Sequence, residues 1–124
     1  MKSVLSAFAV VATISASVSA QQITGSELLN WCQSNDQMIR SGCIAWVSGF
    51  TEGLVTGQQL TQNGFLICLP ANISGLQMQM IFQKTASEHP ELLHQGANLI
   101  AGKAVFGAFK CKPGQAPVYG QKPN

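Results

Sequence analysis

The sequence predicts a small all-α domain, an irregular bundle of four helices, or of four to five, closed by two disulfides. Three observations lead to this prediction. Apolar residues recur at intervals of three, four and seven, and no stretch shows the alternation of a β-strand. Two capping-box patterns mark helix starts. A chain of 124 residues with four cysteines also suits a core stabilised by disulfides.

The first twenty residues are expected to be a signal peptide rather than part of the fold. Lys2 precedes an apolar run, and small residues then end at Ala20, after which cleavage is predicted. Such a leader is compatible with a bacterial periplasm or with eukaryotic secretion, where the sequon at Asn72 would matter. Residues 21–111 then form the helical domain. Residues 112–124, with three of the five prolines, are expected to be a flexible tail.

The first two helices are predicted from a cap and from apolar spacing. Thr24 and Glu27 form a capping box, and this helix should reach Cys32 before a break at residues 34–36. The second helix is predicted from about Gly42 to Leu60. Its inward stripe is expected to hold Val47, Phe50, Leu54 and Gly57.

Two more helices follow a turn at residues 62–64. Ser74 and Gln77 form the second capping box. The expected inward stripe of this helix is Met78, Ile81, Phe82 and Thr85. His89-Pro90 should end it and start a fourth helix over about 91–109, in which Leu92, Leu99 and Phe106 recur at sevens.

Three glycines, Gly49, Gly53 and Gly57, recur at every fourth residue of the second helix. Each costs a helix interior about 1 kcal/mol relative to alanine. Such a choice is expected only where another backbone packs closely against that side. The close contact is either within the chain or at the seam of a dimer.

The four cysteines are expected to form the disulfides Cys32–Cys43 and Cys68–Cys111. The short turn between the first two helices brings the first pair together. The short connection at His89-Pro90 makes the last two helices antiparallel neighbours, which brings the second pair together. A metal site is the alternative use of the cysteines, but there is no C-x2-C pair, so none is predicted.

Composition excludes several functional classes. The formal net charge of +2, without a basic cluster, gives no footprint for nucleic acid. No apolar stretch after the leader is long enough to span a bilayer. A cysteine nucleophile with His89 or His94 is the obvious catalytic candidate, but paired cysteines leave no free thiol. Glu52 is the only acid without an evident local role. No enzyme activity and no cofactor are predicted.

Several elements in a fixed order resemble the Rap/Tai family of immunity proteins. They cover about residues 26 to 111: Cys43, Gly49, Cys68-Leu69-Pro70, Gln77, Lys84, His89-Pro90, Phe109 and Cys111. The sequence departs from the family pattern in having Ala45, Trp46 and Val47 after Cys43. Thr85 and Ala86 follow Lys84, and Lys110 replaces the proline before the last cysteine.

The resemblance implies a periplasmic all-helical protein that sterically blocks a peptidoglycan amidase effector of type VI secretion. It also implies a possible homodimer, which the glycines would suit. We expect the effector to contact the connection after the second helix, at Gln59, Gln62, Asn63 and Phe65, because loops are usual recognition sites. The alternative is an exported helical protein with another binding, chaperone-like or structural role and no effector.

Overall fold

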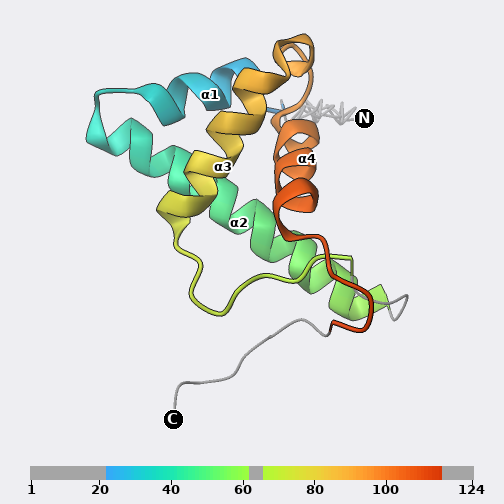
Figure 1. Ribbon diagram of the computed structural model, residues 1–124. Coiled ribbons are helices and arrows are strands. Elements are labelled where there is room, and N and C mark those ends of the chain that lie inside the picture. Colours follow the sequence, from blue (N-terminus) through green and yellow to red (C-terminus); the bar gives the residue numbers. More distant parts are fainter. Residues whose placement is uncertain (1–21, 62–65, 116–124) are drawn as a thin grey trace, which may run out of the picture.

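Four helices make up the fold, which a computed structural model describes over residues 22–61 and 66–115 (Figure 1). They are α1 (Gly25–Gln33), α2 (Gln37–Thr61), α3 (Gly75–Glu88) and α4 (Ala97–Phe109), with a 3₁₀ turn, η1 (Pro90–Leu92), before α4. These described residues contain no strand, so the predicted all-α class is confirmed. The predicted leader over residues 1–20 lies outside the described residues.

Both predicted capping boxes are present. The Thr24 hydroxyl accepts from the Glu27 amide at 3.2 Å, and the Glu27 carboxylate accepts from the Thr24 amide at 2.7 Å. The Glu27 carboxylate also accepts from the Thr24 hydroxyl at 2.8 Å, and the two bonds it accepts, from the Thr24 amide first and the hydroxyl second, hold the pKa of Glu27 below its ordinary value of 4.5. At the start of α3, Ser74 and Gln77 exchange the same two bonds at 3.2 and 2.8 Å. The sequence therefore located the starts of α1 and α3 correctly.

Helix α2 begins before the predicted Gly42 because Asp36 caps it. The Asp36 carboxylate accepts from the amides of Met38 and Ile39 at 2.8 and 3.3 Å. The predicted inward stripe of this helix is also rotated. The side that is buried consists of Cys43, Val47, Thr51 and Val55, whereas Phe50 and Leu54 are half-buried and Gly57 is exposed.

Two polar side chains lie in the core. Thr51 donates its hydroxyl to the Val47 carbonyl at 2.8 Å, which allows its burial. Gln79 on α3 donates to the Cys32 carbonyl at 2.9 Å and so ties α3 to the end of α1. The buried side of α3 accordingly holds Met78, Gln79, Phe82 and Ala86, not the predicted Ile81 and Thr85, which are half-buried.

Helix α4 begins at Ala97, later than predicted, because residues 93–97 pair with the start of α1. The amides of Gly25 and Ser26 donate to the carbonyls of Gln95 and Leu93 at 2.8 and 2.9 Å. The Ala97 amide donates to Ile23 at 2.8 Å. First-turn amides have no partner inside their own helix, so this pairing satisfies both helix starts.

The predicted heptad of α4 does not mark its buried side. Leu99 and Phe106 are 46% and 41% exposed, and Leu92 lies in η1. The residues of α4 that pack into the core are Ala97, Ile100, Ala101, Ala104 and Val105.

Both predicted disulfides, Cys32–Cys43 and Cys68–Cys111, are present. Their Cα atoms are 5.1 and 4.9 Å apart, and they close loops of 11 and 43 residues. In the chain-entropy model these crosslinks are worth about 3 and about 4 kcal/mol. After Cys111 the chain makes a turn at Lys112–Gln115, with Gly114 at φ 77°. Residues 116–124 of the predicted tail lie outside the described residues.

Candidate functional site

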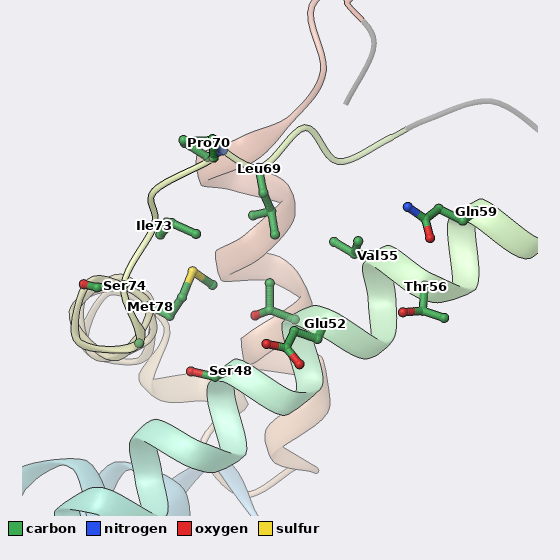
Figure 2. A pocket seen from close by; sticks show the side chains of 13 residues that line it. Ser48, Glu52, Val55, Thr56, Gln59, Leu69, Pro70, Ile73, Ser74 and Met78 are labelled. Atoms are coloured by element: carbon green, nitrogen blue, oxygen red, sulfur yellow. The ribbon is translucent and has the colours of Figure 1, made fainter. Parts of the chain in front are cut away.

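A groove of about 550 Å³ lies between α2, the start of α3 and the segment that connects them (Figure 2). We call it the α2–loop groove. Its volume is in the range of sites that hold small molecules or single side chains. Its lining combines the carboxylate of Glu52 and several hydroxyls with an apolar wall.

The two walls of the groove differ in chemistry. The α2 wall is polar and presents Ser48, Glu52, Thr56 and Gln59 (Figure 2). These residues are three or four apart, so they share one side of the helix. The opposite wall is apolar and consists mainly of Leu69, Ile73 and Met78, with Pro70 at its edge. An occupant would therefore contact hydrogen-bonding groups on one side and aliphatic surface on the other.

Hydrogen bonds from α2 hold the start of the segment that forms the apolar wall. The Gln58 amide donates to the Ile67 carbonyl at 2.7 Å, and its oxygen accepts from the amides of Leu66 and Ile67 at 3.0 Å each. The adjacent disulfide Cys68–Cys111 joins the same segment to the end of α4. The wall is thus positioned before any partner binds, which lowers the ordering cost of association.

The other end of this connecting segment, at the start of α3, packs closely against α2 at Gly75. A Cβ atom placed there would lie 2.7 Å from Ile44 and 3.0 Å from Ser48, both on α2. A larger residue at position 75 would require the Ile44 and Ser48 side chains to move, so glycine suits this close approach. The close helix contact that we expected from glycines therefore occurs at Gly75, and at Gly25 where a Cβ would overlap Ile100.

The three spaced glycines of α2 do not make such a contact. Gly49, Gly53 and Gly57 are exposed, and a Cβ on any of them would meet nothing within 4 Å. The alternative of a close contact within the chain is therefore wrong for the described residues. Whether these glycines form a dimer seam remains a prediction.

An apolar surface borders the glycines on α2. Phe50 and Leu54 of α2 and Leu99 and Phe106 of α4 line a shallow hollow of about 630 Å³, which we call the α2–α4 apolar face. Trp46 extends it, stacking on Phe50 with ring centroids 5.4 Å apart. Gly53 and Gly57 follow Phe50 and Leu54 by three residues, so the glycines are the neighbours of this face.

Of the partner-binding residues predicted from the sequence, only Gln59 is described. It is exposed and lines the α2–loop groove. Gln62, Asn63 and Phe65 lie outside the described residues. Sequence reasoning missed the rest of the groove. The spacing of Ser48, Glu52 and Thr56 at every fourth residue was the available signal.

The described parts of the chain contain neither a cluster of metal-binding side chains nor a free thiol that could act as a nucleophile. All four cysteines are in disulfides, so none supplies a thiol. No three potential metal ligands cluster among these residues. The His89 ring lies 2.9 Å from a Glu91 oxygen, and this hydrogen bond holds the pKa of Glu91 below its ordinary value. No helix in the described part is long and apolar enough to cross a membrane.

Comparison with known proteins identifies the family. The family model for Rap1a immunity proteins matches residues 24–111. The chain belongs to the Rap1a immunity protein family. The match begins at Thr24, the cap of α1, and ends at Cys111, so it includes all four helices and both disulfides. No curated protein and no solved structure matches the chain.

Family membership bears on how the surfaces described above are interpreted. Membership of an immunity protein family implies, in general, that the chain has an effector partner. In this Rap1a protein the α2–loop groove and the α2–α4 apolar face are two hollows formed by different residues of one long helix.

Proposed function

We propose that this Rap1a protein is exported to the periplasm, where it binds a peptidoglycan amidase effector of type VI secretion and sterically blocks its substrate cleft. Family membership over residues 24–111 carries the proposal. Occlusion needs a rigid, complementary surface and no chemistry from the inhibitor. Two disulfides support the location, because such bonds persist in oxidising compartments.

The test first asks whether a reading frame beside this gene encodes a small secreted amidase with a cysteine–histidine site, and cells are then made to produce that amidase in the periplasm. Cells are given the full chain, the chain without residues 1–20, or neither. We expect the full chain to prevent lysis and the leaderless chain to fail, since the latter stays where the amidase does not act. Calorimetry with purified mature chain should then give a saturable complex. Lysis at the same rate with and without the full chain would overturn the proposal.

We also propose that the protein is a homodimer whose seam combines the exposed glycines with the α2–α4 apolar face. Leu99 and Phe106 are large apolar side chains that remain 46% and 41% exposed, and the exposed glycines of α2, next to Phe50 and Leu54, would admit a second backbone. Sedimentation of the purified chain should give twice the monomer mass. Replacement of Phe106 by glutamate should reduce it to the monomer mass. A wild-type monomer at every concentration would contradict the dimer.

A further inference from the structure

Glu52 differs from the other acidic residues of the chain in having no partner among the residues that the structure describes. The chain has five acidic residues, and all of them are described. Four are engaged locally: Glu27 and Asp36 accept from backbone amides, Glu88 pairs with Lys84 at 3.9 Å, and Glu91 pairs with His89 at 2.9 Å. Within the described residues, the Glu52 carboxylate has no hydrogen bond or ion pair. It is thus available to an incoming group.

Glu52 lies inside the α2–loop groove, so a group that binds in the groove would meet its carboxylate. It lies midway along the polar wall of the α2–loop groove, one helical turn from Ser48 on one side and from Thr56 on the other (Figure 2). The facing wall is aliphatic, and no lysine, arginine or histidine is among the described residues that line the groove. The described lining of the groove therefore combines one negative charge with an apolar surface and contributes no cation.

Filling this groove would remove water from the carboxylate. A desolvated charge is costly unless a charged or hydrogen-bonding group replaces the water. An occupant with an aliphatic stem and a cationic end satisfies both walls, since the stem covers Leu69, Ile73 and Met78 while the head meets Glu52. Ser48 and Thr56 offer further oxygens to the remaining N–H groups of such a head. Lysine and arginine have this shape, and an anionic or purely apolar side chain does not.

We propose that the α2–loop groove receives a lysine or arginine side chain from an exposed loop of the effector, with Glu52 as its counter-ion. The identity of the partner rests on the proposed function, whereas the recognition of a basic side chain does not. The groove would hold one or two side chains, so it fixes the register of the complex. A charge pair of this kind favours the right partner over one with an acidic loop.

The first test uses a short capped peptide with a central arginine and its citrulline analogue, which has the same shape without the charge. Each is titrated into the isotopically labelled mature chain and followed by amide chemical shifts. We expect the arginine peptide to shift amides around residues 48–59 and 69–78, and the citrulline peptide to bind about tenfold more weakly. E52Q should abolish the difference between the peptides. E88Q is the matched control and should retain it, because Glu88 is exposed on α3 and outside the groove.

Equal binding of the two peptides, shifts confined to other surfaces, or an unchanged response of E52Q would overturn the inference. The circular dichroism of E52Q should equal that of wild type, since Glu52 is exposed and makes no hydrogen bond or ion pair with the described residues.

The second test uses the amidase. If wild type binds it and E52Q binds with equal affinity, the inference fails while the proposed function stands. If wild type does not bind it, the proposed function fails while the peptide result stands. We expect E52Q to bind at least tenfold more weakly than both wild type and E88Q, with a smaller dependence on salt.

Discussion

Replacing Gly49, Gly53 and Gly57 by alanine should make the isolated protomer more stable. In α2 a Cβ at each position meets nothing within 4 Å, so no steric cost offsets the gain in helix propensity. That gain is about 1 kcal/mol per glycine, or about 3 kcal/mol for the triple variant. Since small domains have total stabilities of about 5–15 kcal/mol, this is a large change. Gly25→Ala is the opposing control, because its Cβ would overlap Ile100, and it should lose about 1–3 kcal/mol.

The same triple variant should weaken self-association. A seam in which two backbones approach across the glycines has no room for three added methyl groups on each copy. Urea unfolding is therefore measured over a range of protein concentrations. We expect the wild-type midpoint to rise with concentration, as linked dimerisation requires, and the variant midpoint to be higher at low concentration and constant. A triple variant that is less stable than wild type at low concentration would refute the reading of these glycines as free of contact. A variant that still dimerises normally would refute the seam.

Three further predictions concern stability. Replacing both Cys68 and Cys111 by alanine should lower the free energy of unfolding by up to about 4 kcal/mol, and replacing Cys32 and Cys43 should lower it by about 3 kcal/mol, as measured by urea unfolding. A smaller loss for the first pair than for the second would argue against an entropic origin of the stabilisation. Because the folded-state pKa of Glu27 is lowered from 4.5, its contribution is complete above that value and is lost as the pH falls through the folded pKa. Glu27→Gln should therefore show a flatter acid-side decline in unfolding midpoint than wild type. Gln58→Ala removes three hydrogen bonds to the segment that forms the groove wall and should cost about 2–3 kcal/mol. Hydrogen exchange at the Ile67 amide should accelerate in step, and unchanged protection there would contradict this role.

Local patterns were sufficient for much of the fold. The helix starts at Thr24 and Ser74 depend on residues three apart, and the structure has both capping boxes. The pairing of Cys32 with Cys43 followed from the short connection between α1 and α2. The pairing of Cys68 with Cys111 was also correct, although residues 89–96 separate α3 from α4 and the predicted connection was shorter. The caps and the first pairing use interactions over a few residues, for which a single sequence contains the relevant information.

Long-range pairing explains most of the errors. Nothing near Pro90 reveals that the carbonyls of residues 93 and 95 are needed by the amides of α1, and this need delays the start of α4. The inward sides of α2 and α3 were rotated for a related reason. Thr51 and Gln79 are polar and so were not assigned to the core, but each has a backbone carbonyl as a partner.

The candidate site was predicted only in part, for reasons of packing. Gln59 was expected at the partner surface and lines the groove. The groove itself exists because Gly75 lets α3 approach α2 and because Gln58 holds the connecting segment. Neither contact follows from periodicity. The sequence already indicated that Glu52 has no local partner on its helix. That it faces an aliphatic wall across a groove depends on the packing of the connecting segment, which the sequence pattern does not reveal.

The pairing of residues 23–26 with residues 93–97 has a consequence for the order of assembly. A chain is synthesised from its amino terminus, so α1 is made first, yet the acceptors for its first amides are among the last parts of the domain to appear. The side chains of Gln22 and Asn98 make a similar link over 76 residues. Any nascent chain that ends before the start of α4 leaves the beginning of α1 without its partners. The start of α1 therefore gains its partners only when residues 93–97 are available, so the first helix to be made cannot be completed until most of the domain has followed it.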